Sequence, residues 1–179
     1  GSLEIVYNYR PVDRGADTCT STIASSTGNA TVPLDGTGVA PELTLAASTG
    51  AFAARRINTT SAAMAFSIKN DGDANQTLTV NSVVPVGNTA DWVVTFDAST
   101  ALAPGELRSG TIAFSPKVGG IRDTQLKIDT NDPVDPDEVF NLIGTGLVAS
   151  ASAPAQAVFP ATVVGQVTTT TVVVSNTGT

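Results

Sequence analysis

The feature that most constrains this chain is a patterned stretch that occurs in it twice. Residues 109–146 contain three runs in which apolar side chains alternate with polar ones, such as Ile112 and Phe114 in the first run and Leu126 and Ile128 in the second. Turn-forming residues separate the runs: Pro116, Gly119, Gly120, Asn131, Asp132 and Pro133. Alternation with a period of two, broken by such turns, is typical of half-buried antiparallel strands.

The second occurrence covers residues 3–38. Pro11 corresponds to Pro116, 105 positions later, and the Gly-Thr-Gly triplet at 36–38 corresponds to the one at 144–146, 108 positions later. The C-terminus repeats a different part, because residues 64–72 correspond to residues 170–178, 106 positions later. The repeating unit is therefore about 106 residues long, which is the size of an independent domain and too long for a solenoid repeat.

We therefore expect a tandem array, of which the chain contains three parts. Residues 1–38 are the C-terminal part of one repeat, residues 39–146 are a complete repeat, and residues 147–179 are the N-terminal part of the next. In the complete repeat, the patterns predict strands at 42–47, 61–69, 77–86 and 91–97, before the three runs of 109–146. About seven strands with frequent turn signals predict an all-β fold, with an antiparallel immunoglobulin-like β-sandwich in each repeat.

The order of the turn motifs is more specific than the number of strands. The motifs are Asn70-Asp71-Gly72, Leu102-Ala103-Pro104-Gly105, Phe114-Ser115-Pro116, Gly119-Gly120, Thr130-Asn131-Asp132-Pro133 and Leu142-Ile143-Gly144-Thr145-Gly146. In this order, the sequence resembles the immunoglobulin-like ASH/MSP/HYDIN domains, whose bacterial relatives occur in long surface and secreted proteins often labelled choice-of-anchor D. The N-terminal part departs from the pattern, because residues 25–28 replace the Asn-Asp-Pro loop. The resemblance implies a structural role, in which the Gly-Thr-Gly triplet ends each repeat.

Composition and charge exclude several classes of function. Nine basic and sixteen acidic residues give a net charge of −7, whereas nucleic-acid and anionic-membrane binding need clustered Lys and Arg. No apolar run approaches the ~20 residues that span a bilayer, so we expect no membrane insertion in this segment. Many Ser and Thr with only three Lys resemble exported bacterial surface proteins, so we expect an extracellular or cell-surface location.

Catalytic groups are scarce. The chain has no histidine and one cysteine, so neither a Ser-His-Asp nor a Cys-His arrangement can form, and zinc sites with histidine or several thiolates are excluded. A carboxylate pair of the glycosidase type remains chemically possible, but an array of small sandwiches offers little cleft for it. We therefore expect a non-enzymatic protein with no cofactor and no catalytic, cofactor-binding or metal residues.

Two features of the complete repeat have a second interpretation. The acidic loop 129–138 could bind calcium at a domain junction, although a solvated strand connection is favoured. Trp92 could be an exposed platform for carbohydrate, but its register with Val94 and Phe96 favours a place in the core.

Three residues of the N-terminal part also stand out. Tyr7 and Tyr9 share a face with Ile5, so we expect them in a core. Cys19 is expected to be a small half-buried side chain, with an intermolecular disulfide as the alternative.

These observations favour a semi-rigid spacer, stalk or filament element whose partners are adjacent repeats of the same or neighbouring chains. The short linkers Val39-Ala40 and Leu147-Val148 should limit bending between repeats. The alternative is a glycan- or protein-binding (adhesin) module, using loops such as 87–90, and a third class is an intracellular scaffold.

The partial repeats leave unpaired strand edges and apolar faces. Either the chain is a window cut from a longer array, or neighbouring molecules dock head to tail. Because head-to-tail docking would lack the two middle strands, we favour the window and expect only weak self-association.

Overall fold

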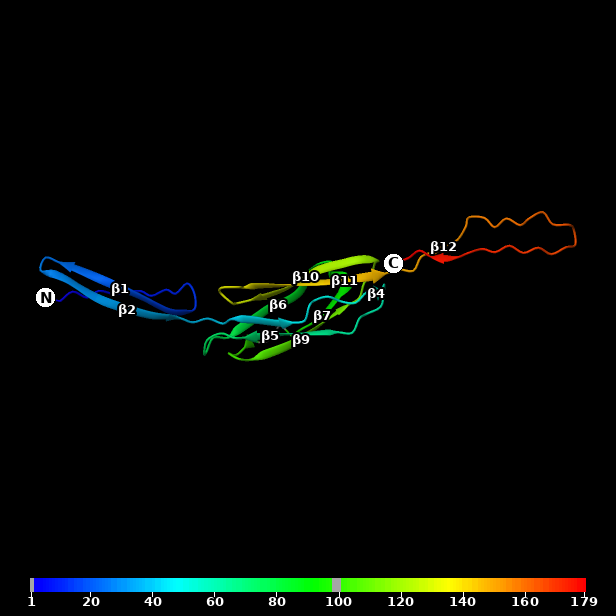
Figure 1. Cartoon of the computed structure of the whole chain (residues 1–179). Coiled ribbons are helices and arrows are strands. Elements are labelled where there is room, and N and C mark those ends of the chain that lie inside the picture. Colours follow the sequence, from blue (N-terminus) through cyan, green and yellow to red (C-terminus); the bar gives the residue numbers. More distant parts are fainter. Residues whose placement is uncertain (1, 98–100) are drawn as a thin grey trace.

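The computed structural model describes residues 2–97 and 101–179. A two-stranded hairpin, a two-layer sandwich and an open C-terminal loop follow one another along one axis (Figure 1). The hairpin pairs β1 (Gly15–Ser25) with β2 (Gly28–Gly38), and β12 (Ala151–Ser152) pairs with β13 (Ser175–Asn176) at the base of the loop. We call residues 2–38 the hairpin segment, 39–147 the sandwich and 148–179 the C-terminal segment. None of the described residues belongs to a helix long and apolar enough to cross a membrane.

The sandwich consists of two sheets. One has the strand order β4-β11-β10-β6-β8 and the other has the order β3-β5-β9-β7. Their bounds are β3 (Leu43–Ala47), β4 (Arg55–Arg56), β5 (Met64–Asn70), β6 (Leu78–Gly87), β7 (Trp92–Thr95), β8 (Ala101–Leu102), β9 (Leu107–Phe114), β10 (Gly120–Thr130) and β11 (Asp137–Leu147). A 3-10 turn, η1 (Thr89–Asp91), precedes β7. Neighbours are antiparallel except β4 and β11, so the predicted all-β, immunoglobulin-like antiparallel sandwich is confirmed.

The sandwich has more strands than the predicted seven. The seven predicted strands are all present, and the described residues add β4 and β8, each of two residues. Both lie at the ends of the five-stranded sheet. A pair of residues is too short to show an alternating pattern, so sequence periodicity does not reveal such edge strands.

The core is built from the alternating positions of the strands. Its buried members are Phe66, Ile68, Leu78, Val80, Trp92, Leu102, Ile112, Phe114, Leu126, Ile128 and Leu142. Trp92 is only 5% exposed, and its ring centroid lies 4.8 Å from that of Phe114 and 5.3 Å from that of Phe52. The prediction that Trp92 belongs to the core is therefore confirmed, and the tryptophan does not form an exposed platform.

The strand predictions at the two ends of the chain are wrong in part. Residues 2–12 contain no strand, although the alternation of Ile5, Tyr7 and Tyr9 predicted one, and residues 153–174 contain none either. The corresponding strands of the sandwich have neighbours: β5 lies between β3 and β9, and β9 lies between β5 and β7. Without such neighbours an alternating sequence has no ladder partner, and a lone strand is not stable in water.

Asn70, at the end of β5, connects three parts of the sandwich and is fully buried. Its side-chain oxygen accepts hydrogen bonds from the N–H groups of Glu42 (3.3 Å) and Gly72 (2.9 Å). Its amide nitrogen donates to the carbonyls of Gln76 (2.8 Å) and Leu102 (2.9 Å). All four hydrogen-bonding positions of the side-chain amide are thus used by backbone groups.

Asn176 in the C-terminal segment provides a matched control. Its side-chain oxygen accepts from the N–H groups of Ser150 (3.1 Å) and Gly178 (3.0 Å), but the residue is exposed. We expect Asn70→Ala to lower the free energy of unfolding by about 2–4 kcal/mol, because buried backbone groups lose their partners, and Asn176→Ala to change it by less than about 0.5 kcal/mol. Urea unfolding followed by Trp92 fluorescence measures both, and equal effects would contradict this role of Asn70.

Candidate functional site

The acidic loop is organised around the backbone. Asp132 is only 4% exposed, and its carboxylate accepts hydrogen bonds from the N–H groups of Leu43 (2.9 Å), Val134 (2.9 Å) and Asp135 (3.2 Å). Burial raises the pKa of Asp132, but these three N–H groups outweigh it and the pKa lies below its ordinary value. Among the described residues, no group of three His, Cys, Asp or Glu side chains is placed to hold a metal ion. Asp132 therefore fixes the loop against β3.

The junction between the hairpin segment and the sandwich is held by Arg14. Its guanidinium donates from Nε to Asp73 Oδ2 (2.8 Å) and from Nη1 to the Glu42 carboxylate. A further, longer contact reaches the carbonyl oxygen of Asp71 (3.5 Å). The Arg14 side chain is 29% exposed and that of Asp73 is 33% exposed, so water only partly screens the charges. We call Arg14, Glu42 and Asp73 the junction clamp.

Asp73 also fixes the linker Val39-Ala40, which joins the hairpin segment to the sandwich. Its Oδ2 accepts from the N–H of Ala40 (3.1 Å), and its own N–H donates to the carbonyl of Ala40 (3.0 Å). The hydrogen bond from Arg14, followed by that from the Ala40 N–H, lowers the pKa of Asp73 below its ordinary value. The pKa of Arg14 is raised by the hydrogen bonds to Asp73 and Glu42. Arg14 and Asp73 are therefore both charged at neutral pH, and together they join both sides of the linker.

The junction at the other end of the sandwich uses neutral contacts. The C-terminal segment contains no charged residue at all. At displacements of 105 and 106 positions, Arg14 corresponds to Gly119 and Asp73 to Thr179. Glu42 corresponds to Ser150, because each donates its N–H to the matching asparagine, Asn70 or Asn176. Next to this junction, and within the C-terminal segment itself, backbone hydrogen bonds run from Val148 N–H to the carbonyl of Thr179 (3.0 Å) and from Thr177 N–H to that of Ser150 (2.7 Å). A Cβ added to Gly119 would lie 2.5 Å from Val148 Cγ2, so this glycine lets the C-terminal segment approach.

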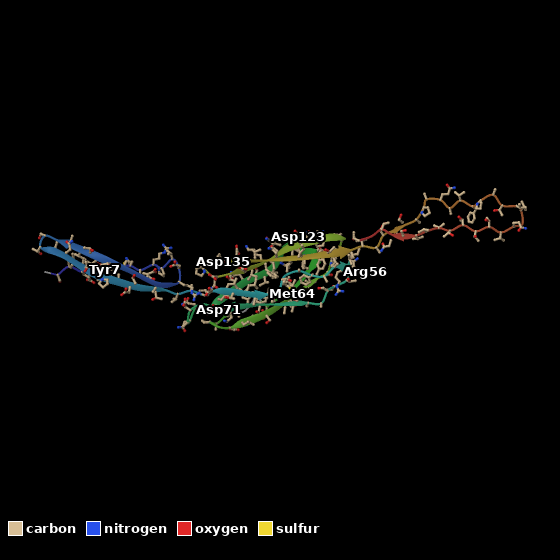
Figure 2. The ribbon with its side chains drawn as sticks, viewed as in Figure 1. Tyr7, Arg56, Met64, Asp71, Asp123 and Asp135 are labelled. Atoms are coloured by element: carbon tan, nitrogen blue, oxygen red, sulfur yellow. The ribbon has the colours of Figure 1, made fainter. Side chains whose placement is uncertain are left out.

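Acidic side chains lie at the end of the sandwich that faces the hairpin segment. Figure 2 shows Asp71 and Asp135 at the end next to the hairpin segment and Arg56 at the end next to the C-terminal segment. Arg56 belongs to β4, which pairs with Leu147 at the end of β11. The acidic end is thus the one that receives the arginine of the preceding segment.

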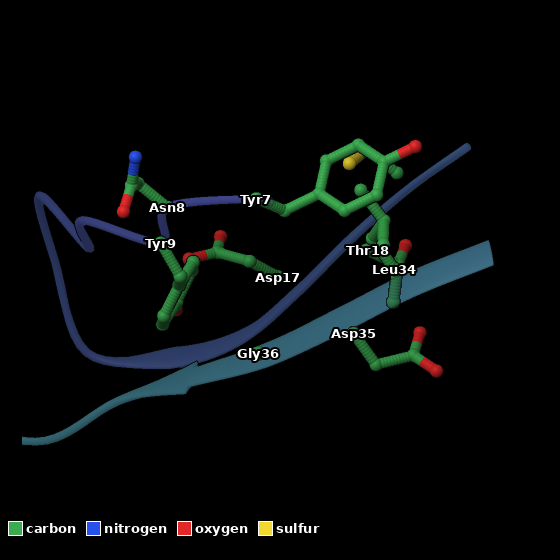
Figure 3. A pocket seen from close by; sticks show the side chains of 9 residues that line it. Tyr7, Asn8, Tyr9, Asp17, Thr18, Leu34, Asp35 and Gly36 are labelled. Atoms are coloured by element: carbon green, nitrogen blue, oxygen red, sulfur yellow. The ribbon is translucent and has the colours of Figure 1, made fainter. Parts of the chain in front are cut away.

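The hairpin segment has an open apolar face. Tyr7, Tyr9, Cys19 and Leu34 line a pocket in this segment, and Figure 3 shows the two tyrosines beside β1 and β2. The predicted burial of these side chains is wrong: Tyr7 is 43% and Tyr9 is 51% exposed, and Cys19 is an exposed free thiol. The reason is that a second sheet, which buries the corresponding positions in the sandwich, does not cover this hairpin.

Two hydrogen bonds hold the tyrosines against β1. Tyr7 donates its hydroxyl hydrogen to Ser21 Oγ (2.8 Å), and Tyr9 donates to Asp17 Oδ2 (2.6 Å). The Tyr9 ring covers Gly36, where an added Cβ would lie 2.6 Å from the ring. The hydrogen bond to Asp17, together with desolvation and the charges of Asp17 and Asp13, raises the pKa of Tyr9 to about 12.

The junction clamp was not recognised from the sequence, although a signal was present. Alignment of the repeat places Arg14 opposite Gly119 and Glu42 opposite Ser150, so charged residues occupy both sides of one junction and neutral residues both sides of the other. When the residues on both sides of a junction are charged in one copy of the repeat and neutral in the other, they are candidates for contact with each other. No catalytic constellation was predicted, and the contacts described above are structural.

No protein family and no curated protein matches the chain in sequence. Similar solved structures include a protein of unknown function from Porphyromonas gingivalis, with 17% identity and a TM-score of 0.48 over 76% of this chain and 68% of that one. The ASH/PapD-like domain 7 of human CEP192 has 14% identity and a TM-score of 0.42, over 58% of this chain and 84% of that one. Alpha-2-macroglobulin of E. coli has 15% identity and a TM-score of 0.36, over 84% of this chain and 10% of that one. At these values the likeness is limited to the general fold.

We expect Arg14→Ala to loosen the hairpin segment from the sandwich, because Asp73 and Glu42 lose their cation. Spin labels on Cys19 and on a Thr95→Cys variant would report this as a broader distance distribution in pulsed dipolar spectroscopy. Arg10→Ala, which removes an exposed arginine of the same segment, is the control and should leave the distribution narrow. Equal broadening in both variants would contradict the clamp.

The clamp also has a defined pH dependence. The pKa of Asp73 is lowered in the folded chain, so its contribution is present above the ordinary value of about 3.9 and is lost as the pH falls through the lowered value. We expect the same distance distribution to stay narrow at pH 4 and to broaden only in stronger acid.

The pH dependence expected for the Tyr9 hydrogen bond has the opposite sign to that of Asp73. A raised phenol pKa means that the docked tyrosine is fully stabilised below about pH 10 and released as the pH rises through about 12. In Tyr7→Phe, Tyr9 is the only tyrosine, so ultraviolet absorbance of the tyrosinate reports its titration directly. Adding Asp17→Asn should lower the midpoint toward 10, and an unchanged midpoint would show that Asp17 is not the cause.

Proposed function

We propose that this chain is a non-enzymatic structural repeat of a cell-surface or secreted protein, which acts as a semi-rigid spacer, stalk or filament element. The observation that carries the proposal is the junction clamp. The linker of two residues, Val39 and Ala40, is short, and Ala40 is in addition bonded through both its N–H and its carbonyl to Asp73. Arg14 then ties Asp73 to the preceding segment.

Tandem repetition is supported by local geometry that recurs at the predicted spacing. Gly38, at the end of β2, lies against the carbonyl of Asp13, and Gly146, near the end of β11, lies against that of Val118. Added Cβ atoms would be 2.0 Å and 2.2 Å from these oxygens. In the same way, the Tyr9 ring covers Gly36 and the Phe114 ring covers Gly144. The C-terminal end of the hairpin segment therefore has the same close glycine contacts as the C-terminal end of the sandwich.

The start of the sandwich also recurs in the C-terminal segment. Leu43 pairs with Asn70, and Ala151, 108 positions after Leu43, pairs with Asn176. Both asparagines accept hydrogen bonds from the glycine two residues further on, Gly72 or Gly178. This supports residues 147–179 as the beginning of another repeat.

The absence of enzyme activity is supported by the buried carboxylates, because their oxygens are already used in hydrogen bonds within the fold. Asp91 is only 1% exposed, and its carboxylate accepts from the Lys117 N–H (2.7 Å) and from Arg122 Nε (2.6 Å). A carboxylate that is fully bonded to a backbone N–H and an arginine has a structural role. The same holds for Asp132 in the acidic loop.

The extracellular setting and the relation to choice-of-anchor D proteins rest on composition and on the turn motifs quoted above. The alternative of a glycan-binding module has less support, because Trp92, its strongest candidate residue, lies in the core. We therefore favour partners that are adjacent repeats of the same or neighbouring chains.

A spacer of this kind should be elongated in solution. A compact globule of 179 residues has a radius of gyration of about 16 Å, and we expect a clearly larger value, with an extended distance distribution, in small-angle scattering of dilute protein. Arg14→Ala should make the particle more flexible without making it compact. A radius near 16 Å would contradict the proposal.

A further inference from the structure

The chain changes from one sheet of the sandwich to the other directly after β3. β3 pairs with β5 up to Ala47, which lies opposite Phe66. The carbonyl of Gly50 then accepts a hydrogen bond from the N–H of Ile143 in β11, in the other sheet (3.0 Å). Gly50 has a φ of 64°, and an added Cβ would lie 2.1 Å from the carbonyl oxygen of Asn141, so the crossing requires glycine. β3 therefore does not continue along β5.

The beginning of β5 is left with a neighbouring strand on one side. Met64 pairs with Ile112 of β9, and just before it the N–H of Ser61 donates to the carbonyl of Phe114 at the end of β9 (2.8 Å). On the side of β3, no strand in the described part of the chain pairs with residues 61–65. An unpaired strand edge of this kind is a template for a further strand.

A pocket lies between this edge and the edge of the five-stranded sheet. One wall comes from residues 51–55, which run beside β11, and another comes from residues 61–64. Phe52 and Met64 give the pocket apolar surface, and most of its other lining residues are alanines. Its volume of about 410 Å³ lies within the range of ~300–1,000 Å³ that is typical of ligand-binding clefts. We call it the edge pocket.

Both walls of the edge pocket carry backbone groups without protein partners. Ala53 and Ala54 on one wall, and Ala63 on the other, make no hydrogen bond to any residue that the structure describes. All three are exposed, so water satisfies their N–H and C=O groups in the free protein. A ligand that displaces this water must offer both donors and acceptors, as the main chain of an extended peptide does.

The edge pocket also contains a guanidinium without an anion. Arg55 lines it, and its half-buried side chain has no hydrogen bond or ion pair within residues 2–97 and 101–179. Other cations of the sandwich are each paired with a carboxylate: Lys69, Arg108, Arg122 and Lys127. A free guanidinium in an apolar pocket favours a ligand that brings a carboxylate of its own.

We infer that the edge pocket binds an extended segment of a partner protein that carries an acidic side chain. The segment continues the line of β3, pairs antiparallel with residues 61–65 and places its carboxylate against Arg55. Main-chain hydrogen bonds supply the affinity, and the contact with Arg55 supplies the specificity. The inference goes beyond the proposed function, because it adds a partner to a repeat otherwise treated as a spacer. Every residue of the site lies within the sandwich.

Blocked octapeptides, titrated into the whole chain, test the inference. In one set Thr and Val alternate and a single Asp occupies each position in turn, and a matched set has Asn instead. Acetylated and amidated ends leave the side chain as the source of the carboxylate. Trp92 is the only tryptophan and its ring lies 5.3 Å from that of Phe52, so its fluorescence reports binding. We expect at least one Asp peptide to bind about ten-fold more tightly than its Asn match, since only Asp makes a charge-assisted contact.

Two neighbouring arginines give a matched pair of variants. Arg55→Ala should remove the preference for Asp over Asn. Arg56→Ala, which changes the next residue of β4 outside the edge pocket, should leave the affinity within about two-fold, as expected for an exposed charge. N-methylation of every second peptide nitrogen should abolish binding in one of its two phases, because one edge of the added strand then loses its donors.

Four outcomes would overturn the inference. They are no binding by any peptide, an equal loss of affinity in both arginine variants, unchanged binding after N-methylation in either phase, and binding of N-acetylaspartate as tight as that of the best peptide. The last would show that the pocket holds a simple anion. None of them affects the proposed spacer, which is tested by small-angle scattering.

Discussion

The structure depends on one requirement: a β-strand in water needs hydrogen-bonding neighbours and an apolar face to cover. In the sandwich, β5 and β9 each have a strand on both sides, and Phe66, Ile68, Ile112 and Phe114 are buried between the sheets. Counterpart sequences at the two ends lack those neighbours and form no strand over residues 3–9 or 170–174. The same pattern thus gives a strand or an open segment according to what lies beside it.

This requirement explains how much could be predicted from the sequence. Alternation located the main strands of the sandwich and placed Trp92 in the core, because those strands are long enough to show a period of two. It failed for β4 and β8, which have two residues each, and it failed for Tyr7 and Tyr9, whose burial depends on a covering sheet. Local pattern determines which face of a strand is apolar, whereas burial depends on distant partners.

The junction clamp was missed for a different reason. Arg14 lies in the bend that precedes β1, and nothing in its own neighbourhood indicates partners 28 and 59 residues away in the sequence. Glu42 and Asp73 are separated from each other as well, and only the fold of β3 and β5 brings them together at one end of the sandwich. A comparison of equivalent positions within the chain is the sequence signal that carries this information.

The two junctions then represent two solutions to the same problem. At the first, Arg14 holds the linker through charged groups that water partly reaches, so the geometry is set by direction-specific hydrogen bonds and responds to pH. At the second, Gly119 admits Val148, and the neighbouring backbone hydrogen bonds lie within the C-terminal segment. Ionic strength cannot weaken an uncharged junction by screening. The charged residues of the first junction have no charged counterpart at the second, so the two ends of the sandwich are held by different kinds of contact.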